Sequence, residues 1–199
     1  MVVYDTMKLK VVKNTPLSEV VKKSNELIEA RYRLSVWEQR LLFTLLTSVT
    51  KHDEDFKRHR VRVADFAEQW QLGDDSHSLH EKVQEAADSL VGRTVQLSAD
   101  PKVSKTVSWL SYVEYVRGSG VVEMEFHSSL KPYLLQLQGN FTQYSLKSVV
   151  KFRNQYSIRL YELLKLEVFK FKNIGHFSKT FNYQDLRLLF GIEEKEYSL

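Results

Sequence analysis

Residues 61–91 read VRVADFAEQWQLGDDSHSLHEKVQEAADSLV. The first three residues, Val61–Val63, have the β-branched composition of a short strand. The apolar spacing after them predicts a helix over Ala64–Leu72, which Gly73 ends because glycine readily takes the left-handed conformation found after helix C-termini. The stretch is therefore expected to open as a strand that runs directly into a short helix.

A second helix is expected after the polar turn at residues 74–77. Ser78 and Glu81 have the spacing of a capping box, in which each side chain accepts a hydrogen bond from the backbone N–H of the other residue. Apolar residues then recur on one side of the predicted helix until Gly92. Two short helices joined by a tight turn are typical of a helix-turn-helix.

The flanking segments complete a winged helix, an α+β fold. Upstream, Ser35 and Glu38 form another capping box at the start of a predicted helix that ends near Val49. Downstream, a strand over Val107–Val116 and an alternating strand over Val121–Phe126 predict a hairpin. Three further segments are expected to form a strand (94–97), a helix (128–137) and an irregular connection (141–150).

The last third of the chain echoes this arrangement. A helix is expected over Asn154–Val168, then a hairpin within 170–180, then a short helix capped by Asn182. Residues 61–73 and 181–191 share the spacing of an Asp, the apolar residues around it and a terminating Gly. The pattern predicts a first winged-helix domain over 1–145 and an incomplete second one over 146–199, truncated before its recognition helix. The alternative is that residues 154–199 merely extend the first domain.

Composition excludes several classes of protein. The 199 residues contain no cysteine, which excludes disulfides, thiolate nucleophiles and cysteine-bound zinc from this chain. The sequence has no apolar run of roughly 20 residues, as a membrane helix requires, and no secretory signal pattern. We therefore expect a cytoplasmic protein with no membrane partner.

Positive charge is concentrated toward the C-terminus. Residues 1–140 hold 19 basic and 19 acidic side chains, whereas residues 141–199 hold 10 basic and 6 acidic ones. A basic stripe of this kind can neutralise phosphates and release their counterions. A solvated helix face is an equally good reading of the charge alone.

Several motifs, in order and at matching spacing, resemble theta-type plasmid replication initiators. They span about residues 20–192 and comprise KKSNELIEA (22–30), LSVWEQRL (34–41), EAADSL (85–90), LKPYL (130–134), FTQY (141–144) and YSIRLYELL (156–164). The resemblance implies two winged helices that bind repeated origin sequences, called iterons, in double-stranded DNA. It also implies a homodimer that represses its own gene, possible contacts with host replication proteins, and no cofactor. The first domain is implied to supply the dimer contact and much of the phosphate grip.

The predicted DNA-binding residues fall into three groups. A helix-turn-helix presents the start of its second helix to DNA, which favours Ser78, His80 and Lys82, although Ser78 could serve only as a cap. Lys102 and Lys105 lie in the loop expected at the wing tip, which could equally be an ordinary exposed loop. The third group surrounds the start of the second module's first helix, where Tyr156 could instead be core: Lys147, Lys151, Arg153, Tyr156 and Arg159.

Self-association and catalysis have their own candidates. The hairpin aromatics Trp109, Tyr112 and Tyr115 are the predicted dimer interface, because an exposed strand can pair with its twin; burial in the core is the competing reading. The histidines have no supporting set of metal ligands, and the sequence lacks the phosphate-loop, zinc-protease and serine-hydrolase motifs. We therefore predict no metal site and no enzyme.

Two other functions remain open beside that of an origin-binding initiator. A winged-helix transcriptional repressor would share the fold without starting replication. A truncated self-associating module with weak DNA binding would show no salt dependence in a DNA titration.

Overall fold

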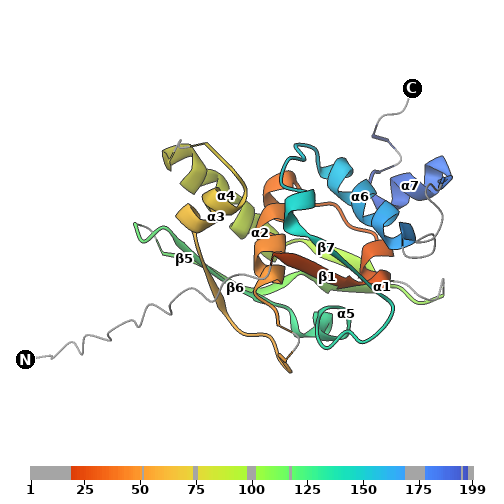
Figure 1. Cartoon of the computed structure of the whole chain (residues 1–199), viewed down its shortest axis with the longest axis horizontal. Coiled ribbons are helices and arrows are strands. Elements are labelled where there is room, and N and C mark those ends of the chain that lie inside the picture. The colour runs from red at the N-terminus through yellow and green to blue at the C-terminus, as the bar shows by residue number, and fades with distance from the viewer. Residues whose placement is uncertain are drawn as a thin grey trace, which may run out of the picture.

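The computed structural model describes residues 19–50, 52–73, 76–97, 102–116, 118–168, 178–193 and 195–196. The helices are α1 (Asn25–Glu29), α2 (Val36–Thr47), α3 (Val63–Gln69), α4 (Ser76–Val91), α5 (Lys131–Leu134), α6 (Gln155–Val168) and α7 (Tyr183–Leu189). The strands are β1 (Val20–Ser24), β2 (His59–Arg62), β3 (Thr94–Leu97), β4 (Lys105–Ser108), β5 (Leu110–Val116), β6 (Val121–Phe126) and β7 (Phe141–Ser145). Figure 1 shows α3 and α4 at one end of the molecule and α6 and α7 at the other.

A winged helix forms the first half of the structure, as the sequence predicts. The helix α2 leads through β2 into α3 and α4, and the chain returns as the β5–β6 hairpin. The three strands form one antiparallel sheet in the order β2-β6-β5. Val61 of β2 pairs with Val122 of β6, and both side chains are buried against the helices. Alternating apolar residues on β6 thus face the core, as the period of two requires.

The helix α2 lies in the middle of the core. Its N-terminus carries the predicted capping box, in which Glu38 N–H donates to Ser35 Oγ and Ser35 N–H donates to the Glu38 carboxylate. The sequence predicts a single buried face, but every residue over 38–47 is buried. Polar residues on this helix therefore need partners inside the protein. Thr44, for example, accepts a hydrogen bond of 3.0 Å from Trp70 Nε1.

Two predicted boundaries are wrong. The helix α4 begins at Ser76, so Ser78 lies within the helix and does not form a capping box with Glu81. Its hydroxyl instead accepts a hydrogen bond of 3.0 Å from Lys82 Nζ. The single strand predicted over 107–116 is divided at Trp109, because β4 pairs with β3 while β5 pairs with β6.

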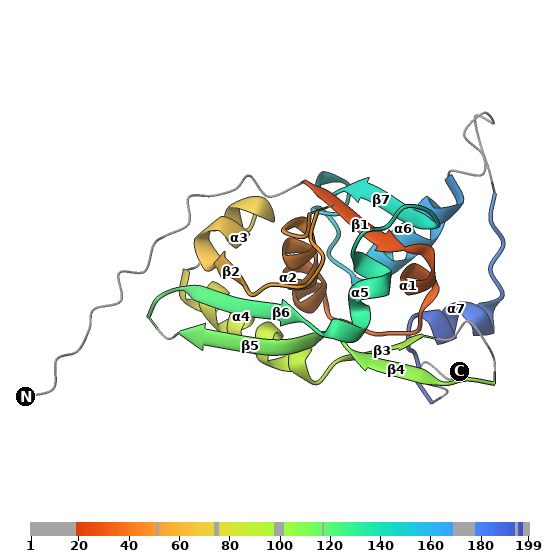
Figure 2. The ribbon, with the colours of Figure 1, turned by 90° about the horizontal axis from the view of Figure 1, so that it is seen from below.

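A second small sheet was not predicted. The segment 141–150, expected to be irregular, contains β7, which pairs antiparallel with β1 so that Val21 lies opposite Tyr144. The helix expected over 128–137 is reduced to a 3₁₀ turn, Ser128–Leu130, and the single turn of α5. Figure 2 shows β1 and β7 beside α1 and α6, well away from the turn of the β5–β6 hairpin.

The predicted division at 145/146 stays a prediction, and the packing across it is continuous. Ile158 of α6 belongs to the same hydrophobic core as α2 and the winged-helix sheet. A smaller cluster joins α6 to α1 and α7 through Ile28, Leu163 and Phe190. The hairpin predicted within 170–180 lies almost entirely outside the described residues.

A buried ionic network fastens α6 to the rest of the protein. The Glu162 carboxylate is fully buried, lies 2.7 Å from Lys23 Nζ and 2.9 Å from Arg159 Nη1, and accepts a hydrogen bond of 2.7 Å from Tyr144 Oη. Tyr32 Oη also donates to it at 3.2 Å. Burial by itself raises the pKa of Glu162, but the charges of Lys23 and Arg159 outweigh burial and lower the pKa to about 2.

The hairpin turn is fixed against α4. Gly118 and Gly120 both have positive φ, 80° and 63°, in the predicted turn between β5 and β6. A Cβ on Gly120 would lie 3.0 Å from His80 Cε1, and His80 Nδ1 is 2.9 Å from Tyr115 Oη on β5. Glycine at 120 therefore lets the turn approach the helix closely.

Replacing Glu162 with glutamine tests the network. The variant keeps the side chain's shape but leaves Lys23 and Arg159 buried without their counter-charge. We expect a loss of roughly 3–5 kcal/mol in the free energy of unfolding at pH 7, measured by urea titration. The ionised carboxylate stabilises the fold above pH 4.5, and this stability is lost as the pH falls toward 2, because the folded-state pKa is the lower one.

The Glu162→Gln variant should therefore lose less stability than the wild type between pH 4.5 and 2. Glu125→Gln is the control, because it breaks an exposed pair with Arg58 and should cost less than about 1 kcal/mol. Equal stability of the two variants at pH 7 would contradict a central role for Glu162.

Two alanine substitutions separate the backbone requirement of the turn from its packing. Gly118→Ala introduces a Cβ with nothing within 4 Å, so only the positive φ penalises it, by about 1 kcal/mol. Gly120→Ala also pushes against His80 and should lose about 1 kcal/mol more, through the His80–Tyr115 hydrogen bond. Thermal unfolding measures both variants. The packing explanation fails if His80→Ala does not remove the difference between them.

Candidate nucleic-acid interface

The predicted contact residues on α4 differ in accessibility. Ser78 and His80 are half-buried, and the His80 ring is engaged with Tyr115 of the hairpin. Lys82 is exposed, and its ammonium group lies 5.7 Å from the centroid of the Trp37 ring on α2. Of the three, Lys82 is thus the one whose charge is open to a ligand.

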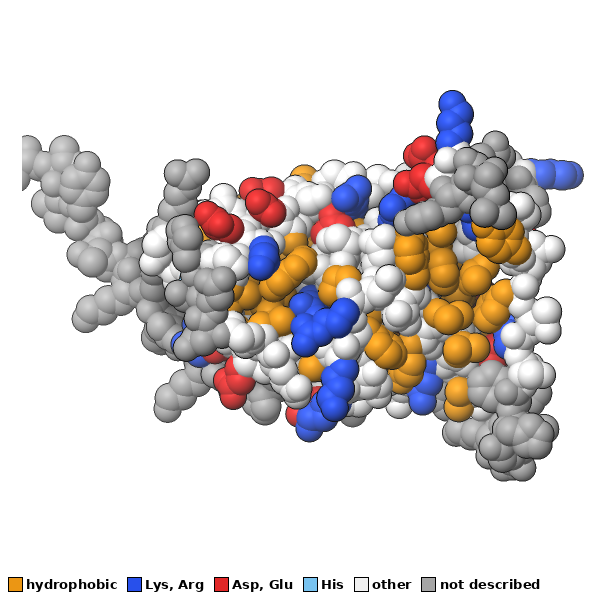
Figure 3. Space-filling model, turned by 90° about the horizontal axis from the view of Figure 1, so that it is seen from above, with side chains coloured by type: hydrophobic (Ala, Val, Ile, Leu, Met, Phe, Trp, Pro, Cys, Tyr) orange, Lys and Arg blue, Asp and Glu red, His pale blue; other side chains and the backbone are white. Residues whose placement is uncertain are grey.

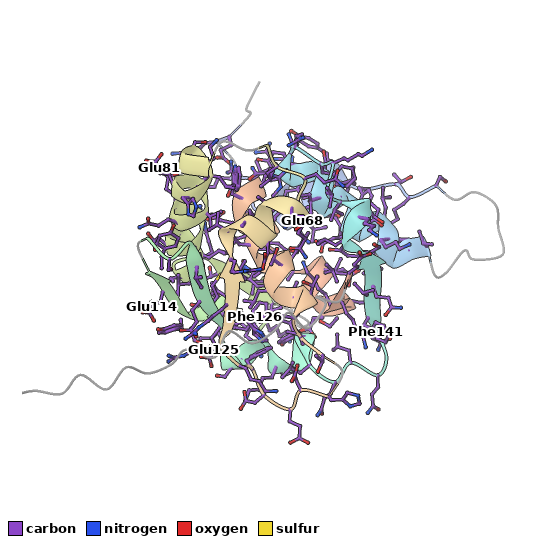
Figure 4. All side chains as sticks on the ribbon, turned by 60° about the vertical axis from the view of Figure 1, so that its left-hand side comes forward. Glu68, Glu81, Glu114, Glu125, Phe126 and Phe141 are labelled. Carbon is purple, nitrogen blue, oxygen red and sulfur yellow. The ribbon has the colours of Figure 1, made fainter. Side chains whose placement is uncertain are left out.

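The remaining exposed face of α4 is acidic. Glu81, Glu85 and Asp88 are exposed along it. Figure 4 shows Glu81 on the same side of the molecule as Glu114 and Glu125 of the β5–β6 hairpin. The exposed carboxylates of α4 therefore disfavour a phosphate backbone along this side of the helix.

Arginines on the outer face of the winged-helix sheet are paired with glutamates of β6. Arg58 Nε lies 3.4 Å from Glu125 Oε2, and Arg60 Nε lies 3.1 Å from Glu123 Oε1. Arg58 also stacks on Tyr112, with its Cζ 3.8 Å from the ring centroid. The positive charge of this face is therefore largely cancelled within the protein.

Unpaired positive charge lies before α6. Lys151 and Arg153 are exposed, and within the described residues neither forms an ion pair. Lys147, also predicted, is exposed but lies 2.9 Å from Glu19 Oε2. Figure 3 shows lysine and arginine side chains gathered near the middle of one face, beside an apolar area at the α6–α7 end.

Arg40 is a residue that the sequence reasoning missed. It is 3% exposed, and its guanidinium lies between two tryptophans, with Cζ 5.3 Å from the Trp37 ring centroid and 5.5 Å from that of Trp70. Burial lowers the pKa of Arg40, and the nearby positive charge of Arg153 lowers it further. The sequence did offer one sign of this residue's role, because an arginine stands inside a leucine-rich helix. The structure shows that this helix is buried on all sides.

Arg40 connects two groups of residues that the sequence predicted separately. It shares the Trp37 ring with Lys82 of α4, and it lies close enough to Arg153 for their charges to interact. We call the group of Arg40, Lys82, Lys151 and Arg153 the basic face. The winged helix and the start of α6 thus contribute to one surface.

Two residues predicted for DNA binding at α6 point inward. Tyr156 stacks on Phe190 with ring centroids 5.4 Å apart, and its hydroxyl is buried. Arg159 is 2% exposed and donates to Tyr32, Glu162 and the carbonyls of Ile28 and Ala30. Helical periodicity turns these positions toward α1 and α7, so neither side chain is available to a phosphate in this structure.

Lys102 and Lys105 belong to a different hairpin. Lys105 is the first residue of β4, and Lys102 lies three residues before it. The strand β4 pairs with β3, whereas the hairpin that packs on α4 is formed by β5 and β6. Lys105 Nζ donates to Tyr133 Oη at 3.1 Å. Figure 2 shows the β3–β4 hairpin at the opposite end from the β5–β6 turn, so these lysines do not join the basic face.

The predicted dimer residues are divided between core and surface. Trp109 is fully buried and packs edge-on against Tyr32, with ring centroids 5.0 Å apart, so it cannot contact a partner in this structure. Tyr115 is held by His80. Tyr112 lies on the outer side of β5, where it donates to the Glu114 carboxylate.

Neither a metal site nor a membrane-spanning helix is found in the part of the chain that the structure describes. The His, Asp and Glu side chains there form no group of three or more that could hold a metal ion. No described helix is both long and apolar enough to cross a membrane.

Comparison with curated proteins gives two relatives from Escherichia coli. An uncharacterized 27.6 kDa protein is 31% identical over 182 residues, which cover 85% of this chain and 74% of the relative. A replication initiation protein is 29% identical over 153 residues, which cover 75% of this chain but 47% of the relative. The chain thus spans about half the length of the second relative.

A solved structure shares the fold. The Pi initiator protein, crystallised in complex with iteron DNA, superposes with a TM-score of 0.68 at 15% identity, over 87% of this chain and 73% of Pi. The family model described as "Initiator Replication protein, WH1" matches residues 20–165, which extend past position 145 into α6. The chain therefore belongs to the Initiator Replication protein family and carries its first winged-helix domain.

Proposed function

We propose that this chain acts in plasmid replication initiation and binds the repeated sequences of an origin through its basic face. The observation that carries the proposal is that cations on one surface of the winged helix are paired with carboxylates and cations on another are not. Arginines on the outer sheet face are paired with glutamates. Lys82, Lys151 and Arg153 are exposed and form no ion pair within the described residues, and Lys82 lies over the same Trp37 ring as Arg40.

The relatives support a DNA partner. The structure of Pi contains iteron DNA, and one E. coli relative is a replication initiation protein. An electrostatic mechanism suits the basic face, because exposed lysines and arginines displace counterions from the phosphate backbone. Contacts of this kind position a protein on the duplex without reading its sequence.

Lys82→Gln tests this function. A duplex carrying adjacent direct repeats from the plasmid origin is titrated with the chain by fluorescence anisotropy at several salt concentrations. We expect wild-type affinity to fall steeply with salt and the variant's slope to be smaller by about one, because one phosphate contact is lost. Lys57→Gln is the control, since Lys57 is exposed but paired with Asp53 at 2.8 Å. A wild-type chain without salt-dependent binding would overturn the proposal.

We further propose that the chain forms a repressor dimer and that β5 makes the contact between the two copies. The strand is at the edge of the β2-β6-β5 sheet, and within the described residues it pairs with β6 alone. Edge strands present unpaired backbone groups to a second chain. Tyr112, on the outer side of β5, would then lie in the interface, whereas Trp109 would not.

Sedimentation equilibrium over a hundredfold range of concentration tests the dimer. Tyr112→Lys places a charge at the contact and should weaken dimerisation at least about tenfold. Tyr183→Lys is the matched control, because Tyr183 is a 64% exposed tyrosine on α7. A wild type that stays monomeric throughout, or equal effects of the two variants, would exclude β5 as the contact.

A winged-helix transcriptional repressor with no role in initiation is the alternative function. The gene's ability to maintain a plasmid that carries adjacent direct repeats distinguishes the two. Loss of maintenance in the Lys82→Gln variant supports an initiator, whereas DNA binding without plasmid maintenance supports a repressor.

A further inference from the structure

Arg40 is a buried cation that lacks an anion. Within the described part of the chain, its side chain makes one hydrogen bond, from Nη2 to the carbonyl of Phe152, at the long distance of 3.5 Å. Its Nε is buried with no partner, and among the described residues no carboxylate pairs with it. A charge removed from water normally requires a counter-charge or a full set of hydrogen bonds.

Arg159 in the same protein shows how a purely structural buried arginine is satisfied. Its two Nη atoms donate to Tyr32 at 2.6 Å, to Glu162 at 2.9 Å, and to two backbone carbonyls at 2.8 and 3.0 Å. Its Nε, like that of Arg40, has no partner. The difference lies in the acceptors of the Nη groups. Those of Arg159 have four acceptors, one of them a carboxylate, whereas among the described residues those of Arg40 have one distant carbonyl and no carboxylate.

The surroundings of Arg40 add positive charge. Arg153 lies near enough to lower the pKa of Arg40 further, after burial itself. Arg153 also lies two residues before α6, whose 14 residues direct the positive end of their dipole toward this position. Two guanidinium groups and a helix N-terminus thus converge where the described structure holds no opposing carboxylate.

The rings of Trp37 and Trp70 hold the Arg40 guanidinium in place. Stacking on aromatic faces stabilises a guanidinium while leaving its edge donors free for an oxygen ligand. Arginine's planar fork matches the oxygens of a phosphate, and a site that is fixed in advance loses little entropy on binding.

We propose that Arg40 and Arg153 form a phosphate site that takes one phosphate group of the DNA backbone. The inference rests on the proposed function and deepens it, because it names a specific contact on the basic face. Arg153 would approach the phosphate from the exposed side, and Arg40 would donate to it from beneath. The contact fixes α2 and the start of α6 on the same nucleotide.

The test uses the full chain and the variants Arg153→Gln, Arg40→Gln and Arg40→Lys. In salt-series anisotropy titrations with duplex DNA, we expect each glutamine variant to lose about tenfold in affinity and about one unit of salt slope. The double glutamine variant should lose little more than either single one, because both arginines contact one phosphate. Arg40→Lys keeps the positive charge but loses the planar pair of donors, so its DNA affinity should lie between those of the wild type and Arg40→Gln.

Controls separate this contact from a structural role. Arg60→Gln removes an exposed arginine that is paired with Glu123 and should leave the slope unchanged. Urea unfolding should show Arg40→Gln to be no less stable than wild type, since it removes an uncompensated buried charge. A wild-type salt slope in Arg153→Gln, or a loss of stability with a wild-type slope in Arg40→Gln, would overturn the site.

Tryptophan fluorescence tests the site independently of DNA. Inorganic phosphate should change the emission of Trp37 and Trp70 in the wild type and not in Arg40→Gln. If the wild type does not bind DNA but responds to phosphate, the proposed function fails and the site stands with free phosphate as its ligand. If DNA binds with a normal slope in every variant and phosphate has no effect, the site fails and the function stands.

Discussion

The Glu162 carboxylate is the interaction on which the rest of the structure depends. It is fully buried and joins β1 through Lys23, the segment after α1 through Tyr32, and β7 through Tyr144. Three segments of the chain therefore meet α6 at one charge. Because α6 is held in this way, the segment just before it lies beside α2, where Arg40 Nη2 donates to the carbonyl of Phe152, the neighbour of Arg153. The network thus helps to hold the start of α6 next to the winged helix, where the two contribute to the basic face.

Basic side chains in this protein fall into two groups, those that pair with a carboxylate of the same chain and those that do not. Lys23 and Arg159 are buried with Glu162 and hold the fold together, and Arg58 and Arg60 are paired with glutamates on the sheet. Members of the basic face form no ion pair in the described structure. Net charge alone could not show this difference, because paired and unpaired cations count equally in the sequence.

The winged helix itself could be predicted from sequence, because capping residues, helix-ending glycines and alternation along β6 are local signals. Boundaries failed where long-range contacts decide them. Trp109 divides a predicted strand because the chain changes pairing partner there, and β7 forms only because β1, over a hundred residues earlier, pairs with it. The same limit applies to the site. Residue type pointed the wrong way for Arg159, because a charged side chain is normally placed on the surface, and no local pattern shows that the arginine of a buried helix lies next to the segment before α6.

The three tryptophan indoles give the most direct measure of where DNA binds. Trp37 and Trp70 flank Arg40, whereas Trp109 packs against Tyr32 in the interior. In a titration of the ¹⁵N-labelled chain with duplex DNA, followed by NMR, binding at the basic face shifts the indole N–H signals of Trp37 and Trp70 and leaves that of Trp109 in place. Unchanged signals for Trp37 and Trp70, with shifts confined to backbone amides of the β5–β6 hairpin, would contradict binding at this face.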